Sequence, residues 1–150
     1  MYISSRNFYI RSLEERDKEF IKHVEETRPW NRAFDNIEDV FNYRLFDDLW
    51  NNYIEAKESW CIFDKDNQFY GVIHIDRESE TECEIYFQML PDIDIKGIGS
   101  ELLNKFLEAL NAEYGIEEFE VSLWDENDIS KNIFEEAGYE FDDEYLEISL

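Results

Sequence analysis

Hydrophobic residues recur along the chain with two different periods, which predict helices and strands in turn. Apolar positions three or four residues apart predict helices at 14–26, 37–58 and 100–114, and a shorter one over 127–137 that ends at Gly138. Alternating positions and short apolar runs predict strands at 8–13, 60–63, 69–75, 83–90, 119–124, 139–141 and 145–150. The order β α α β β β α β α β β fits one α/β (α+β) domain over residues 1–150.

Three details of this pattern concern the middle of the chain. The polar run at 64–68 predicts a hairpin loop between two strands, and Gly71 predicts a bulge or a close backbone approach. On the strand at 83–90, Cys83, Ile85, Phe87 and Met89 should share one face. Glu84, Tyr86, Gln88 and Leu90 should then share the opposite face.

The stretch from 88 to 110 contains the first candidate site. The strand breaks at Pro91, and the chain passes through Lys96-Gly97-Ile98-Gly99 before a helix begins at Ser100. The first turn of a helix has unpaired N–H groups, and its dipole adds partial positive charge, so this position suits an anion and most often phosphate. A glycine pair before a helix is also often no more than a tight turn, so both interpretations stay open.

This segment resembles the acetyl-CoA-binding segment of the GNAT superfamily of N-acetyltransferases, whose pattern is Gln or Arg, two residues, Gly, one residue, then Gly or Ala. Gly97 and Gly99 match, whereas Asp94 replaces the Gln or Arg and Ile95 replaces a frequent Gly. The run 127–139 is similar to the family's later block, N-x-x-S-x-x-x-[LY]-E-K-x-G-F. The Asn-x-x-Ser form is closest to the branch that acetylates ribosomal-protein N-termini.

The resemblance implies the GNAT fold. We expect a central mixed, mostly antiparallel sheet of about six or seven strands, flanked by about four helices. It also implies acetyl-CoA as cosubstrate. The positions that match the family's cofactor contacts are Gln88, Met89 and Leu90 for the thioester and pantetheine, Lys96, Gly97, Ile98, Gly99 and Ser100 for the pyrophosphate, and Asn127 and Phe134 in the last helix. Phe134 stands where the family often has a tyrosine that protonates the leaving thiolate.

Two residues are catalytic candidates by the same resemblance. Glu84 lies on the strand before the cofactor loop, where an acid often serves the family as general base. Ser130 is a possible substitute for the missing tyrosine hydroxyl, or simply a residue near the N-terminal turn of its helix. Glu84 in turn could only face solvent, because acidic residues are spread along the whole chain.

Composition narrows the class of partner. The formal net charge is -24, which argues against direct binding of nucleic acid or anionic membranes and favours cationic partners. The alternative is an acidic surface kept for solubility. Cys61 and Cys83 lie in apolar runs and read as reduced core cysteines; His23 and His74 are isolated, and no metal site is expected. No run is long enough for a membrane helix and no signal peptide is apparent, so we expect a cytoplasmic monomer or homodimer.

These observations together predict an N-acetyltransferase. It would transfer acetyl from acetyl-CoA to a primary amine, on a small cation or a protein N-terminus, by direct attack assisted by a general base. Two alternatives from other classes stay open. One is a GNAT-fold binding module without catalysis, and the other is an acidic protein-interaction or nucleic-acid-mimic protein.

Overall fold

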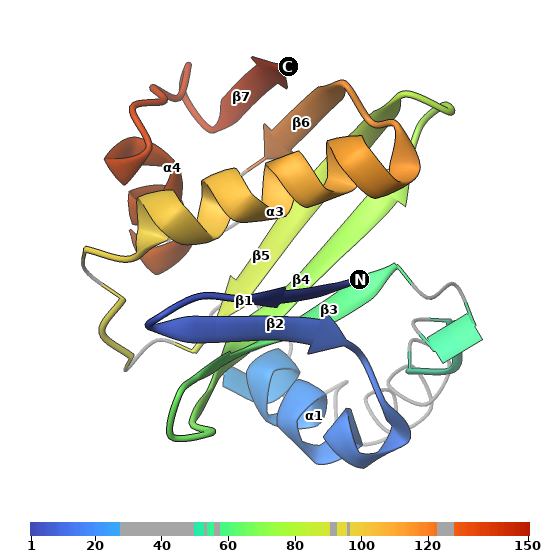
Figure 1. The fold of residues 1–150 in the computed structure, drawn as a ribbon, viewed down its shortest axis with the longest axis vertical. Helices are drawn as coiled ribbons and strands as arrows, with labels where there is room; N and C mark the ends of the chain where they lie inside the picture. The colour runs from blue at the N-terminus through green and yellow to red at the C-terminus, as the bar shows by residue number, and fades with distance from the viewer. Residues whose placement is uncertain (28–49, 53, 56–57, 91–92, 96, 123–127) are drawn as a thin grey trace, which may run out of the picture.

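The computed structural model describes residues 1–27, 50–52, 54–55, 58–90, 93–95, 97–122 and 128–150 (Figure 1). Its strands are β1 (Tyr2–Ser4), β2 (Phe8–Ser12), β3 (Ser59–Asp64), β4 (Phe69–Arg77), β5 (Glu82–Met89), β6 (Glu118–Ser122) and β7 (Tyr145–Ser149). Its helices are a 3-10 turn (Glu15–Asp17), α1 (Lys18–Thr27), α3 (Gly99–Tyr114) and α4 (Asp128–Glu136). Residues 50–52 and 54–55 are helical as well.

The strands form one seven-stranded sheet in which they lie side by side in chain order. Every neighbouring pair is antiparallel except β5 and β6, which are parallel. A parallel pair needs a crossover connection, and α3 supplies it. The sheet is therefore mixed and mostly antiparallel, as the sequence predicts.

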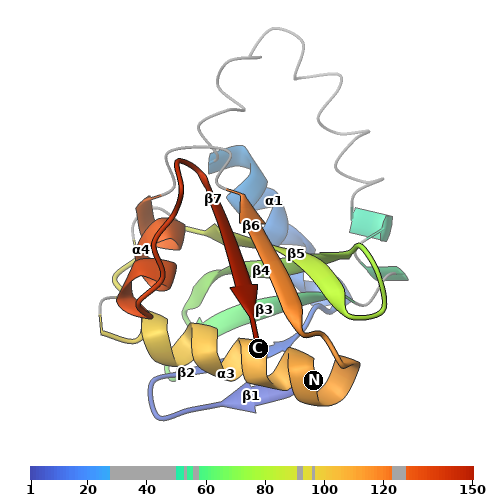
Figure 2. The same ribbon diagram turned by 90° about the horizontal axis from the view of Figure 1, so that it is seen from above.

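Helices cover both faces of the sheet, with α3 on one side and α1 on the other (Figure 2). α3 buries its apolar stripe, Leu102, Leu103, Phe106, Leu107 and Leu110, against the odd-numbered residues of β5. On the opposite face Ile21 of α1 and Trp50 pack with side chains of β3 and β4. The alternation of buried and half-buried residues along β5 confirms the two faces predicted for it. α4 packs beside the beginning of α3 (Figure 1).

The turn chemistry of the central hairpin is as predicted. The Asp64 N–H donates to the Gln68 carbonyl at 3.0 Å, closing the loop between β3 and β4. Gly71 lies beside a register shift in that pair, and a Cβ there would stand 2.5 Å from the Gln88 carbonyl oxygen of β5. Only glycine permits so close an approach of two strands, so both features expected of Gly71 are present.

Two details of the predicted order are wrong. Residues 139–141 form no strand, because the Tyr139 N–H closes the end of α4 on the Phe134 carbonyl, and a turn at Asp142–Tyr145 follows. Tyr139 and Phe141 instead cover the core as part of a loop. The sheet gains its seventh strand at the other end, where β1 pairs with β2. Its three residues are too few for a periodic signal.

The long helix predicted at 37–58 falls mostly outside the described residues. The predicted helix at 14–26 is present as the 3-10 turn followed by α1. Among the helices that the structure describes, none combines the length and the apolar character needed to cross a bilayer.

Candidate active site

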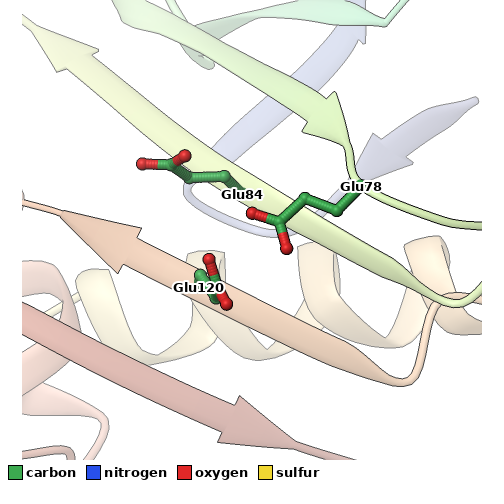
Figure 3. A group of neighbouring side chains, drawn as sticks. All are labelled: Glu78, Glu84 and Glu120. Atoms are coloured by element: carbon green, nitrogen blue, oxygen red, sulfur yellow. The ribbon is translucent and has the colours of Figure 1, made fainter.

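The two parallel strands separate partway along their length. Ladder pairing joins Glu82–Glu84 of β5 to Glu118–Glu120 of β6, and the strands then diverge (Figure 3). β5 continues to Met89 while paired with β4 alone among the described strands. We call this divergence of the two strands the splay. It lies in the strand preceding the loop that leads into α3.

Successive residues of β5 direct their main-chain N–H and C=O groups alternately toward β4 and toward β6. This alternation decides which groups face the side where β6 diverges. The Leu90 N–H donates to the Tyr70 carbonyl of β4 at 2.9 Å, so even-numbered residues of β5 bond toward β4. Phe87 and Met89 therefore direct their main-chain groups toward β6. Of the three residues matched to the thioester and pantetheine, Met89 presents its amide on this side. Gln88 and Leu90 use theirs within the sheet.

Glu84 is the last residue of β5 that pairs with β6, directly where the strands part. Its half-buried side chain lies on the face opposite α3. Tyr86 is two residues further along the same face. Burial and a hydrogen bond with the Glu84 carboxylate together raise the pKa of the Tyr86 phenol. Glu84 is thus held in place by a neighbour rather than extended freely into water.

Two other acids converge on Glu84. The carboxylates of Glu78, Glu84 and Glu120 each have an oxygen within 4.8 Å of the others (Figure 3). A hydrogen bond with Glu120, a slight loss of solvation and the repulsion of neighbouring carboxylates raise the pKa of the exposed Glu78. Two residues back along the same pair of strands, a hydrogen bond with Glu82 raises the pKa of Glu118. Such crowding of like charge is relieved by a proton or another cation.

The loop before α3 holds an anionic group of the protein itself. The Glu136 carboxylate, at the end of α4, accepts from the Gly97 N–H at 3.2 Å and from the Gly99 N–H at 3.1 Å. Gly97 has φ +89°, a conformation that favours glycine. These two donors are among those predicted to bind the pyrophosphate, and here they hold the oxygens of a carboxylate. The loop therefore fits an anion.

The rest of the predicted cofactor loop is anchored to the core. Ile95 is buried, and its carbonyl accepts from the Ile98 N–H at 3.1 Å in a tight turn. This explains the departure from the family's frequent Gly at 95: the side chain fills the core. Ser100 is half-buried in the first turn of α3, and Asp94 is exposed. Lys96 and Asn127 lie outside the described residues.

Two predicted residues of α4 face inward. The Ser130 hydroxyl is buried and donates to the Phe87 carbonyl of β5 at 2.8 Å, which ties α4 to the strand at the splay. Phe134 has no exposed area and packs edge-on against Phe87, with ring centroids 5.4 Å apart. In this conformation Phe134 is a core residue. Ser130 is placed at the diverging side, although its hydroxyl hydrogen is engaged.

The two cysteines and His74 are buried in the fold, and their environments are those of structural residues. Cys61 and Cys83 are free and buried, and burial raises the pKa of Cys83 to about 12. His74 is buried with its Nδ1 2.6 Å from the Ser59 hydroxyl.

Sequence reasoning missed Glu78, Glu120 and Glu136. Glu120 could have been found from the alternation along its strand, which places it on the same face as Glu118. Glu136 could have been found from the quoted motif, which has Lys at that position.

Comparison with known proteins agrees with this architecture. The acetyltransferase (GNAT) domain family matches residues 7–140. A GNAT-family acetyltransferase from Bacillus anthracis has a TM-score of 0.68 at 20% identity, covering 99% of this chain and 98% of that one. A spermidine N-acetyltransferase from Vibrio cholerae, solved with CoA and spermine, has a TM-score of 0.67 at 18% identity, covering 91% and 82%. No curated protein matches the chain by sequence.

The match over most of the chain, together with the mixed sheet and its splayed parallel pair, defines the class. The chain belongs to the GNAT acetyltransferase family, whose members are acetyl-CoA-dependent transferases, and it has the GNAT fold.

Proposed function

We propose that this chain is an N-acetyltransferase that moves the acetyl group of acetyl-CoA to a primary amine, with Glu84 as general base. The observation that carries the proposal is the position of Glu84. It stands at the last paired residue before β5 and β6 diverge, three residues before Phe87 and five before Met89 on the same strand. Direct acyl transfer needs a base and backbone donors, and this strand carries both beside the diverging segment.

The donor contacts follow from the residues already described. Gly97 and Gly99 present N–H groups that hold anionic oxygens, and the matching position for a compensating cation is Lys96. The Met89 amide faces the diverging side and is the candidate donor to the thioester carbonyl. Acetyl-CoA supplies an activated acyl group, so the protein has to position the two reactants and manage protons.

The chemical step is a direct displacement. The amine nitrogen attacks the acetyl carbon, a C–N bond forms and the C–S bond breaks. The amine loses its proton to the Glu84 carboxylate, directly or through water. The thiolate that leaves takes up a proton, for which Ser130 is the candidate donor within the described residues, with water returning a proton to the serine oxygen. Its hydroxyl would have to release the Phe87 carbonyl to serve in this way.

The acidic cluster at the β5–β6 pair supports a cationic acceptor. Glu78, Glu84 and Glu120 converge at the splay, and the whole chain has a formal net charge of -24. A cation entering there relieves the crowding that raises the pKa of Glu78. The Vibrio cholerae relative of known structure is a spermidine N-acetyltransferase crystallised with spermine. We therefore place a polyamine-like amine first among acceptors.

A protein N-terminus is the second acceptor class. The Asn-x-x-Ser form of the last motif, in which Ser130 is the serine, supports it through the ribosomal-protein branch. The chemistry at Glu84 would be the same, so only the acceptor distinguishes the two.

Initial rates of CoA release with a panel of amines test the proposal. The panel holds spermidine, spermine, single amino acids and basic peptides with free N-termini, each incubated with acetyl-CoA. We expect the largest kcat/KM with a polyamine and an acetylated product by mass spectrometry. A larger value with peptides would move the acceptor to protein N-termini. Acetyl-CoA binding without turnover on any amine would favour a non-catalytic module.

A further inference from the structure

The Glu136 carboxylate contacts the loop before α3, called the donor loop below, and the proposed function gives it no role. It is at the last position of α4, yet it accepts hydrogen bonds from two amides on the far side of the α3–α4 contact. It can reach them because Gly99 has no side chain. A Cβ at Gly99 would stand 2.8 Å from Glu136 Oε2 and 3.1 Å from the Ile133 Cα.

The charge of this residue is unusual for its position. In the motif quoted above, the residue after the conserved Glu is Lys, and in this chain it is Glu136. The substitution exchanges a cation for an anion beside the start of a helix. Since the amides and the helix dipole there favour negative charge, Glu136 takes the place that an external anion would otherwise occupy.

We propose that Glu136 determines the affinity of the donor site by competing, from within the chain, with the diphosphate of acetyl-CoA. The inference rests on the proposed function. For the diphosphate to accept from Gly97 and Gly99, the carboxylate has to give up both hydrogen bonds. Once displaced, it remains tethered to α4 and repels the phosphates. Both effects weaken binding of a donor that carries a diphosphate, and neither acts on a donor without one.

Calorimetry on the full chain tests this with two probes, CoA and pantetheine, which differ by the 3′-phospho-ADP portion. The variants are Glu136→Gln, which removes the charge at nearly constant shape, and Glu136→Lys, which restores the motif. Glu135→Gln is the matched control. It is the preceding residue, carries the same charge, is exposed and pairs with Lys131 at 3.6 Å rather than with the loop.

We expect both Glu136 variants to bind CoA about ten- to a hundredfold more tightly than wild type, because the competing charge-assisted hydrogen bonds are gone. Pantetheine affinity and the control should stay within about twofold. Thermal melting verifies that each variant is folded. If one variant unfolds, the other decides the question.

Unchanged or weaker CoA binding in a folded Glu136 variant would overturn the inference, and the carboxylate would then be only a cap for α3. That result leaves the proposed function intact if wild type still acetylates an amine. Tighter binding of pantetheine to the same degree as CoA would also overturn it, because the effect would then be unrelated to the diphosphate. If no form of the chain, Glu136 variants included, binds CoA at all, the donor site itself is wrong.

Discussion

At the scale of single residues, a two-pronged ion pair between β2 and the 3-10 turn holds a buried carboxylate. Arg11 Nη1 and Nη2 donate to the two carboxylate oxygens of Asp17 at 2.7 and 2.8 Å, and Asp17 has no exposed area. Burial by itself would raise the pKa of Asp17. The hydrogen bonds from Arg11 and the Glu14 amide outweigh it, so the pKa lies below its usual value.

The first prediction is that Arg11→Met lowers the free energy of unfolding by about 3–5 kcal/mol at neutral pH, because Asp17 is left charged and buried without its partner. Urea titration measures the change. Arg16→Met is the control. Arg16 pairs with Glu14 on the surface and is 69% exposed, so its loss should cost under about 1 kcal/mol. If Arg11→Met and Arg16→Met lower the free energy of unfolding equally, the ion pair of Arg11 with buried Asp17 does not have the importance given to it here.

The pH dependence follows from the sign of the shift. With a folded-state pKa below the unfolded one, the stability that Asp17 contributes in wild type is present above the unfolded pKa. It is lost as pH falls through the folded pKa. Without Arg11 burial dominates and raises the pKa, so the variant should regain stability as the acid is protonated. The difference between wild type and variant should therefore shrink in acid.

At the scale of elements, the contact between α3 and α4 depends on a missing side chain. Gly99 is buried at the first position of α3, and a Cβ there would stand 3.1 Å from the Ile133 Cα, which is backbone and cannot move aside alone. The second prediction is that Gly99→Ala widens this contact and costs about 1–3 kcal/mol in urea titration.

The control for that prediction is the next residue. Ser100 is half-buried, and its Oγ accepts a long 3.4 Å hydrogen bond from Asn104, so Ser100→Ala should change stability by less than about 0.5 kcal/mol. A Gly99→Ala variant as stable as Ser100→Ala would show that the helices can separate freely. It would also remove the reason for glycine at this position.

Most of the elements could be predicted from the sequence because their periodicity is strong. The alternation along β5 and the stripe from Leu102 to Leu110 each mark one buried face. The errors lie where local turn chemistry decides. Tyr139 and Phe141 have an alternating spacing, but the Tyr139 N–H closes α4 and both side chains cover the core from a loop. β1 has only three residues, which are too few to show a period.

The site could be predicted less fully than the fold. Gly97 and Gly99 of the donor loop could be predicted, because they match a sequence motif with fixed spacing. The convergence of Glu78 and Glu120 on Glu84 was not visible, because the three residues come from three places in the chain and only the strand register joins them. Glu136 reaches the loop across the α3–α4 contact, which no sequence period encodes.

At the scale of the whole molecule, the net charge acts on both reactants with opposite sign. A formal charge of -24 attracts a polyamine and repels the phosphates of acetyl-CoA. The third prediction is that raising NaCl from roughly 20 to 200 mM, which brings the Debye length below about 10 Å, raises the KM for spermidine by several-fold. The same change should lower the Kd for acetyl-CoA.

A monoamine acceptor is the control for the salt experiment, because its single charge should give a smaller slope than spermidine. If the KM for spermidine rises and the Kd for acetyl-CoA falls with salt, the electrostatic field of the whole protein acts on both reactants. If the KM for spermidine does not depend on salt, the cluster of Glu78, Glu84 and Glu120 is not the acceptor site.

The most direct test of the account is the turnover of Glu84→Gln, measured with spermidine and saturating acetyl-CoA beside wild type. Gln keeps the size of the side chain but cannot accept the amine proton. We predict that kcat falls by about 10²–10⁴ while the calorimetric Kd for acetyl-CoA is unchanged. Glu82→Gln, on the same strand and face, is the control and should retain its rate. Normal turnover by Glu84→Gln, or an equal loss in both variants, would contradict the assignment of Glu84 as the base.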